Sequence, residues 1–181
     1  MAEKLNSMRL LERYSIPYTI HKYDPSAPDA VAVAAALDVP AAHVFKTLVV
    51  SGTGTRPLLA MIPADCQLHL KRLASLVGVK HLDLVPREVV ERLTGLRIGG
   101  IGALALTAKR WESYLDKSAL TYSRIYVNAG QRGTMIGLAP ADLAKVVDAT
   151  IEAIAIRPGG VFNVLSLSDS GIEERVERSE K

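Results

Sequence analysis

The stretch AAHVFKTLVV, residues 41–50, decides how the rest of the chain is interpreted. β-branched and apolar residues occupy both of its alternating faces, which is typical of a strand buried in the middle of a sheet. Lys46 is out of place there, because a buried ammonium group is costly unless a specific partner meets it. The stretch therefore predicts a central strand and raises the question of why a lysine lies in it.

The composition is that of an ordinary globular domain. The 181 residues are 49% hydrophobic and 23% charged, which suffices for one buried core. No apolar run approaches the roughly 20 residues of a membrane-spanning helix, and the charged N-terminus lacks the apolar stretch of a secretory signal. The single cysteine, Cys66, cannot form an internal disulfide. These features predict a cytoplasmic protein without a membrane partner.

The net charge of +3 is unevenly distributed. Residues 165–181 hold five acidic and three basic residues, which leaves the preceding part of the chain with a net charge of +5. A body this mildly basic can contact a polyanion at its edge, but it lacks the dense basic stripe of a duplex-DNA-binding protein. With 5% aromatic residues there is no obvious platform for stacking single-stranded bases. We therefore expect no specific DNA binding.

Helix and strand patterns alternate along the chain. Periodicity predicts helices over residues 3–15, 26–37, 68–78, 86–95 and 139–149, the second with Ser26 as a candidate N-cap. Strands are predicted over 18–23, 44–50, 58–63, 79–85 and 150–156, with a strand, turn and strand over 123–138 and an apolar strand after the glycine-rich loop at 95–103. Residues 44–50 and 58–63 flank a short turn and predict a hairpin. This order predicts an α/β protein with a mixed sheet, forming one domain over 1–156, followed by an accessory or flexible acidic tail over 157–181.

Two interpretations of Lys46 are open. Its aliphatic stem can lie on apolar surface near a strand end while the ammonium reaches water. Alternatively, Lys46 is a fixed cation at the floor of a cleft, where it binds a phosphate, a carboxylate or a carbonyl oxygen. Thr47 points to the opposite face of the strand, but its backbone adjoins such a cleft.

Two glycine-containing segments are further candidates. GLRIGGIGA, residues 95–103, lacks the Gly-Lys-Ser/Thr ending of a P-loop and the spaced glycines of a dinucleotide site, so no nucleotide cofactor is expected. Its amides can approach a ligand closely, or the segment is a simple tight turn. NAGQRGTM, residues 128–135, predicts a hairpin turn with Arg132 at its tip, in reach of a phosphate.

The histidines and the cysteine predict neither a metal site nor a catalytic triad. Cys66 and His69 have the spacing of half a metal site, but no second half follows. No metal or other cofactor is expected, and Cys66 is interpreted as an inert buried thiol. His21 and Tyr23 share one face of a strand, so they either line the same cleft as Lys46 or simply pack.

Five segments, taken in order, resemble the YbaK/EbsC family of aminoacyl-tRNA deacylases. They are IPYTIHKY, VFKTLVV, LHLKRLASLVGVK, TGLRIGGIGAL, and IYVNAGQRG with the following IGLAPADLAKVVDA. The similarity runs from about residue 5 to 155. More specifically, the chain resembles the bacterial Cys-tRNA(Pro)/Cys-tRNA(Cys) deacylases of this family. Family members hydrolyse mischarged tRNA in trans, and the same fold occurs as the editing insertion of prolyl-tRNA synthetases.

The resemblance implies a mixed, strongly twisted, barrel-like sheet flanked by helices. It also implies that Lys46 is the essential lysine and that tRNA(Pro) is the partner, with tRNA(Cys) and prolyl-tRNA synthetase as further candidates. In Cys-specific members the thiol of the substrate attacks its own carbonyl, so the protein supplies no nucleophile. The expected substrate-binding residues are Tyr23, Thr47, Gly99, Gly100, Ile101, Gly102 and Arg132.

Two positions depart from the family pattern and leave the edited amino acid open. Ala103 stands near the end of the glycine segment, where the family usually has proline, and Met135 stands where an acidic or amide residue is common. Deacylation of Ala-tRNA(Pro) is the nearest alternative. A non-catalytic module of the same fold that binds tRNA or a synthetase is the alternative from another class.

Overall fold

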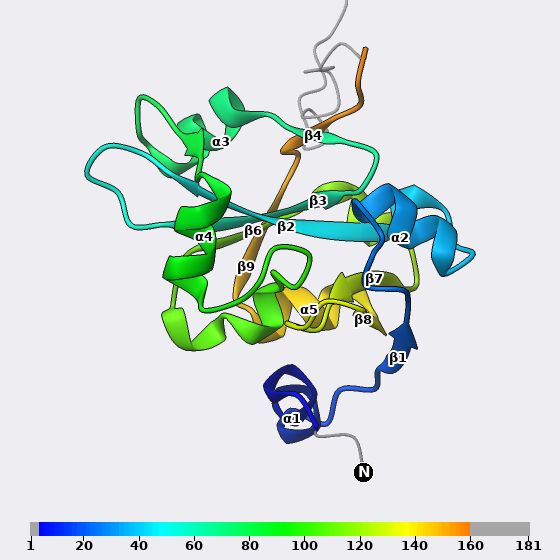
Figure 1. The fold of residues 1–181 in the computed structure, drawn as a ribbon. Coiled ribbons are helices and arrows are strands. Elements are labelled where there is room, and N and C mark those ends of the chain that lie inside the picture. Colours follow the sequence, from blue (N-terminus) through cyan, green and yellow to red (C-terminus); the bar gives the residue numbers. More distant parts are fainter. Residues whose placement is uncertain (1–3, 160–181) are drawn as a thin grey trace, which may run out of the picture.

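Strand β2 (Val44–Ser51) lies in the middle of a large mixed sheet (Figure 1). The computed structural model describes residues 4–159. The strand order is β1-β8-β7-β2-β3-β6-β9, and β5 pairs with the far end of β2. The pairs β2–β7, β3–β6 and β6–β9 are parallel and the others are antiparallel. The predicted mixed α/β sheet is confirmed, but within residues 4–159 the end strands β1 and β9 do not pair, so no closed barrel forms.

The bounds of the elements follow the predicted order. The remaining strands of the sheet are β1 (Thr19–Lys22), β3 (Leu58–Pro63), β5 (Asp83–Leu84), β6 (Ser113–Asp116), β7 (Ile125–Asn128), β8 (Thr134–Leu138) and β9 (Ala149–Glu152), while β4 (Gln67–Leu68) pairs with β10 (Ala155–Ile156). The α-helices are α1 (Asn6–Arg13), α2 (Ala30–Ala36), α3 (Leu70–Val77), α4 (Arg87–Thr94) and α5 (Pro140–Val146), and short 3-10 helices span Ala41–His43, Ala103–Ala105, Thr107–Lys109 and Lys117–Thr121.

Helices cover both faces of the sheet. Figure 1 shows α3 on one side of β2 and β3, with α1 and α5 on the other side. The largest buried cluster joins Phe45 of β2 to Leu11 of α1 and Leu143 of α5. A second cluster packs Leu73 of α3 against Ile62 of β3, on the opposite face. Burial of these apolar side chains, at about 25 cal/mol per Å² of apolar surface, is the main force that holds the layers together.

The N-cap of helix α2 lies three residues later in the chain than predicted. Ser26 is not the N-cap; the cap is Asp29, whose Oδ1 accepts a hydrogen bond of 2.8 Å from the Ala32 amide. Ser26 instead donates its amide to the carboxylate of Asp24, in a local turn that precedes the helix. An Asx turn formed by Asp24 thus takes the place of the first helical turn that was predicted here.

The apolar strand predicted after the glycine-rich loop is also wrong. Residues 103–109 form two short 3-10 helices that bury Leu104 and Leu106 in the main core. The strand of this region is β6, which begins at Ser113 and was not predicted. A short apolar run fits several buried conformations, so its composition alone could not select the strand.

Two predicted strands differ in extent: only β5 of the range 79–85 is a strand, and the range 150–156 is divided between β9 and β10, which belong to different sheets. Most other elements are confirmed. The hairpin β2–β3, the hairpin β7–β8 and the helix ends at Gly78 and Gly95, both with left-handed backbone, are as expected. The predicted tail falls mainly on residues 160–181, which lie outside the described residues. None of the helices in the described part of the chain is both long and apolar enough to cross a membrane.

Candidate active site

A cleft of about 880 Å³ opens along β2, between α2 on one side and α4 with the loop that follows it on the other. In Figure 1 these two helices stand near opposite ends of β2. The cleft includes Lys46 and Thr47 from the strand, Tyr23 from the segment before α2, and Arg132 from the β7–β8 turn. A volume of this size accommodates a ligand as large as an aminoacyl nucleoside.

The cleft exists because one edge of β2 is incompletely paired. Strand β3 pairs with β2 from Phe45 to Val50 along one edge, whereas the other edge pairs with β7 only at Val44 and Phe45 and with β5 only at Val50 and Ser51. The Val44 carbonyl accepts the Ala64 amide, on the β3 side, so by alternation the backbone groups of Thr47 point to the gap. The Thr47 hydroxyl is buried without a hydrogen-bond partner in the described part of the chain. A bound molecule could satisfy these groups.

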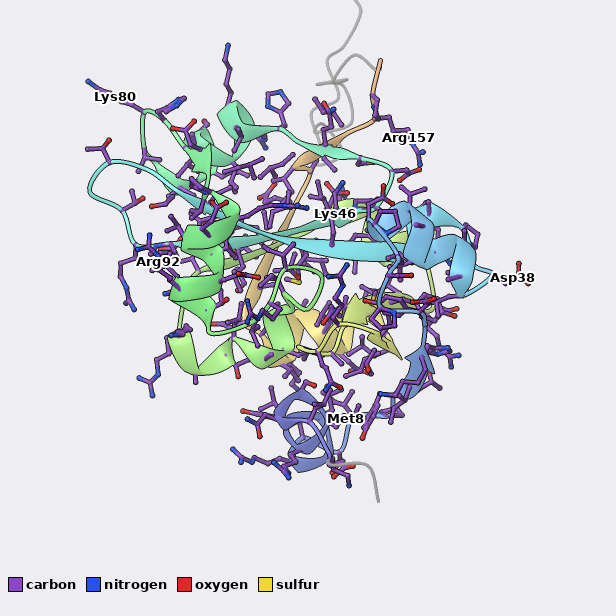
Figure 2. The ribbon with its side chains drawn as sticks, viewed as in Figure 1. Met8, Asp38, Lys46, Lys80, Arg92 and Arg157 are labelled. Carbon is purple, nitrogen blue, oxygen red and sulfur yellow. The ribbon has the colours of Figure 1, made fainter. Side chains whose placement is uncertain are left out.

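Lys46 lies half-buried over the middle of the strand. Figure 2 places its label near the centre of the molecule, whereas Lys80, Arg92 and Arg157 extend from the periphery. Its Nζ donates a hydrogen bond of 3.0 Å to the Ala64 carbonyl. An ammonium has three donors, so this bond leaves further donor capacity for a ligand.

The charge of Lys46 is tuned by its surroundings. Burial lowers the pKa of its ammonium, and the negative charges of Cys66 when ionised, Asp29 and Asp65 offset part of that effect. Burial also raises the pKa of the Cys66 thiol to about 11, so near neutral pH the two aspartates are the negative neighbours that matter. A neutral, buried thiol agrees with the interpretation of Cys66 as inert.

The glycine-rich loop is held firmly against the β7–β8 hairpin. The Gly99 carbonyl accepts hydrogen bonds from the Asn128 side chain at 2.7 Å and from the Tyr23 hydroxyl at 3.3 Å. At the start of the loop, the Ile98 amide donates to Glu91 of α4 at 3.0 Å. The amides of Gly99 and Ile101 have no hydrogen-bond partner within residues 4–159, so they remain available as donors.

Close packing explains the glycines of this loop. A Cβ on Gly102 would lie 2.3 Å from the Asn128 carbonyl oxygen, and one on Gly100 would lie 2.9 Å from the Arg132 amide nitrogen. Gly99 has a φ of +86°, and a Cβ there would meet the Arg132 side chain. The loop and the hairpin turn are therefore matched surfaces rather than separate turns.

The structure brings together most of the predicted site residues. Those that line the cleft are Tyr23, Lys46, Thr47, Gly99, Ile101 and Arg132. Gly100 and Gly102 are buried behind the loop and do not line the cleft. His21 does not line it either; its ring packs edge-on against Tyr126, 5.0 Å between centroids.

Sequence reasoning missed Arg87 and Arg97 of the cleft, and also three further polar residues: Asp29, Glu91 and Asn128. The last three share one difficulty. Each is distant in sequence from the glycine loop or from Lys46, and each has an ordinary local role as a cap, a helix residue or a strand end. Of the two departures from the family pattern, Met135 is buried and lines the cleft, whereas Ala103 is buried in the main core and lies outside it. The residues described here include no group of three or more histidine, cysteine or acidic side chains placed to hold a metal ion.

Comparison with known proteins agrees with this geometry. Residues 24–146 match the family model described as an aminoacyl-tRNA editing domain. The chain belongs to this family. A protein of Enterococcus faecalis with the provisional name Cys-tRNA(Pro)/Cys-tRNA(Cys) deacylase EbsC is 33% identical over 86% of this chain and 95% of its own length.

Longer proteins contain a related segment. A proline–tRNA ligase of Geobacter sulfurreducens is 31% identical over 59% of this chain, which corresponds to 19% of the ligase. Among solved structures, a protein provisionally described as a trans-editing enzyme for prolyl-tRNA synthetase has a TM-score of 0.72 at 22% identity, covering 84% of this chain and 98% of that one. A further structure, a hypothetical protein designated APE2540, has a TM-score of 0.77 at 21% identity over 83% of this chain and 99% of that one. These two likenesses support the fold alone.

Proposed function

We propose that this protein is a trans-editing deacylase that cleaves the ester of misacylated tRNA, with Cys-tRNA(Pro) and Cys-tRNA(Cys) as the first substrates to consider. The observation that carries the proposal is the Lys46 ammonium, which has spare donor capacity in a cleft beside a glycine loop. The 3′ end of aminoacyl-tRNA presents a carbonyl oxygen and a nearby phosphate, and either is a suitable ligand for an ammonium. Membership of the editing-domain family supports the ester of aminoacyl-tRNA as the bond that is cleaved.

In this proposal each predicted residue has a distinct task. Lys46 binds the terminal phosphate or polarises the ester carbonyl, and the free amides of Gly99 and Ile101 stabilise the developing oxyanion. Tyr23 and Thr47 contact the aminoacyl end, and Arg132 meets a phosphate. Gly100 and Gly102 contribute indirectly, by allowing the loop to pack on the hairpin.

The chemistry needs no nucleophile from the protein when the amino acid is cysteine. The substrate's sulfur attacks its own carbonyl carbon, the new S–C bond replaces the ester C–O bond, and the thiol proton passes to the departing 3′ oxygen. An alanyl ester has no thiol, so water would have to attack instead. Met135, which is buried in the cleft wall and departs from the family pattern, is a residue of this chain that bears on that choice of amino acid.

The partners follow from the substrate. We propose tRNA(Pro) as the main partner, tRNA(Cys) as a second one, and prolyl-tRNA synthetase as a protein with which the deacylase associates during editing. The synthetase partner is supported by the related segment within proline–tRNA ligases. A cytoplasmic location stays a prediction of the sequence.

The test is a single-turnover deacylation assay with Cys-tRNA(Pro), Cys-tRNA(Cys), Ala-tRNA(Pro) and Pro-tRNA(Pro) side by side. We expect both cysteinyl esters to be cleaved and Pro-tRNA(Pro) to remain intact. Cleavage of Ala-tRNA(Pro) alone would keep the deacylase and change its specificity. Binding of tRNA without turnover of any ester would contradict the proposed activity and favour the non-catalytic module.

A further inference from the structure

Three arginines of the cleft lie on one of its walls, which also holds the carboxylate of Glu91. Arg87 of α4, Arg97 of the loop after it and Arg132 of the β7–β8 turn provide cations on the side of α4 and the glycine loop. On the α2 side the charged residue is Asp29. Figure 1 shows α2 and α4 at different positions along β2, so the net charge of the cleft residues is positive on the α4 side and negative on the α2 side.

The two carboxylates of the cleft differ in how fully they are engaged. Glu91 accepts the Ile98 amide with one oxygen and has its other oxygen 3.6 Å from Arg97 Nη1, so both oxygens serve the protein. Asp29 accepts the Ala32 amide with Oδ1, whereas its Oδ2 has neither a hydrogen bond nor an ion pair with any of residues 4–159. Asp29 is therefore the carboxylate of the cleft with an oxygen to spare.

The carboxylate of Asp29 is solvent-exposed and is anchored through its other oxygen. Its backbone is extended, with φ −153° and ψ 177°, and the capping bond fixes the carboxylate at the first turn of α2. Its negative charge is near enough to offset part of the lowering that burial causes in the pKa of Lys46, which lies in the same cleft. A carboxylate thus lies in the same cleft as the ammonium that would meet the ester.

The substrate has a matching polarity. An aminoacyl ester carries an α-amino group on the carbon next to the ester carbonyl, and a substantial fraction of this group is protonated near neutral pH. On the other side of the carbonyl lie the ribose and the phosphates of the tRNA. A cleft with a free carboxylate at one wall and arginines at the other favours one orientation of the bound ester, with its amine toward the carboxylate and its phosphates toward the arginines.

We propose that Asp29 binds the α-ammonium group of the aminoacyl ester, an inference that rests on the proposed function and deepens it. The ammonium donates a charge-assisted hydrogen bond to Oδ2, while the tRNA phosphates extend toward Arg97 and Arg132. Asp29 is then a substrate-positioning residue that recognises the free amine of the aminoacyl group. The protein consequently discriminates against esters whose amine is absent or blocked, such as N-acylated or peptidyl-tRNA.

The variant Asp29→Asn separates this role from helix capping. Asparagine caps a helix about as well as aspartate, so α2 keeps its first turn while the charge is lost. The matched control is Asp38→Asn, just past the other end of α2; Asp38 lies outside the cleft, and its φ of 54° suits asparagine. Thermal unfolding of all three proteins should coincide.

The assay compares each ester with its desamino analogue, in single turnover. The analogue is 3-mercaptopropionyl-tRNA for cysteine and propionyl-tRNA for alanine, each of which keeps the ester and loses only the amine. We expect Asp29→Asn to slow cleavage of the natural ester about tenfold, the order expected for a lost charge-assisted hydrogen bond, and to leave the analogue unchanged. The control should match wild type on both.

Two outcomes would overturn the inference. An equal loss on both esters would mean that Asp29 acts through the charge of Lys46 or through the fold, and an unchanged rate on both would mean that it has no role. Either result is distinguishable from failure of the proposed function, because that failure appears in wild type as no turnover of the natural ester.

Discussion

Two charged side chains lie in the same sheet, Lys46 in β2 and Asp116 in β6, and their surroundings are opposite in kind. Asp116 is 5% exposed, and its carboxylate accepts four hydrogen bonds, from the amide and hydroxyl of Ser118 and from the amides of Ile154 and Ala155. Lys46 has one hydrogen bond, to Ala64, and opens on a cleft. A charge whose hydrogen-bonding capacity is filled by the protein serves the fold, whereas a charge with spare capacity in a cleft is a candidate for ligand binding.

The strongest test of the structural side of this comparison is Asp116→Ala. Removal of the carboxylate leaves the Ile154 and Ala155 amides without acceptors, so we expect the free energy of unfolding to fall by about 3 kcal/mol. Urea denaturation measures it, and Asp83→Ala, at an exposed site, should change stability by less than about 0.5 kcal/mol. Stability close to wild type for Asp116→Ala would remove the contrast with Lys46.

A smaller effect is expected where the fold and the site meet, at Asn128. Alanine removes the donor to the Gly99 carbonyl and the acceptor for the Gly130 amide, so the glycine loop loses its anchor to the hairpin. We expect single-turnover deacylation to slow about tenfold with tRNA affinity little changed. Asn6→Ala, on α1 and outside the cleft, is the matched control and should retain the wild-type rate.

The smallest effect concerns the pH dependence of stability. Since burial lowers the pKa of Lys46 in the folded state, the unfolded chain binds more protons between that pKa and the ordinary value of 10.5. Lys46 therefore opposes folding at neutral pH, and this opposition fades as the pH rises through its folded-state pKa toward 10.5.

Lys46→Met makes that effect measurable. The advantage of Lys46→Met over wild type in free energy of unfolding should shrink from pH 7 toward about 10.5. Urea denaturation across this range checks it, with Lys80→Met, at the periphery in Figure 2, as the matched lysine substitution. A difference between wild type and Lys46→Met that stays constant with pH would argue against a desolvated ammonium.

The signals that could be predicted from the sequence were local ones. Three features can be recognised from a pattern of about ten residues each: the apolar strand around Lys46, the hairpin turn at 128–135 and the glycine segment. Each lies where it was expected. The 3-10 helices at 103–109 were not predicted, because buried apolar runs look alike whether extended or turned.

The parts that could not be predicted depend on contacts between distant segments. The gap in strand pairing at Thr47 exists because β7 pairs with only the first residues of β2 and β5 with only the last. The sequence of β2 itself does not indicate where these two partners end. Asn128 acquires its importance from a carbonyl 29 positions earlier in the chain, and Asp29 from lying in the same cleft as Lys46. Tertiary pairing, rather than local pattern, builds these parts of the candidate site.

The most direct measurement is the single-turnover deacylation rate of Cys-tRNA(Pro) by wild type and Lys46→Met, taken together with urea denaturation of both proteins. We predict a rate at least about 100-fold lower in the variant, as for the loss of one preorganised donor, with stability equal to or above wild type. A folded Lys46→Met that cleaves the ester within a few-fold of the wild-type rate would contradict the proposed role of Lys46.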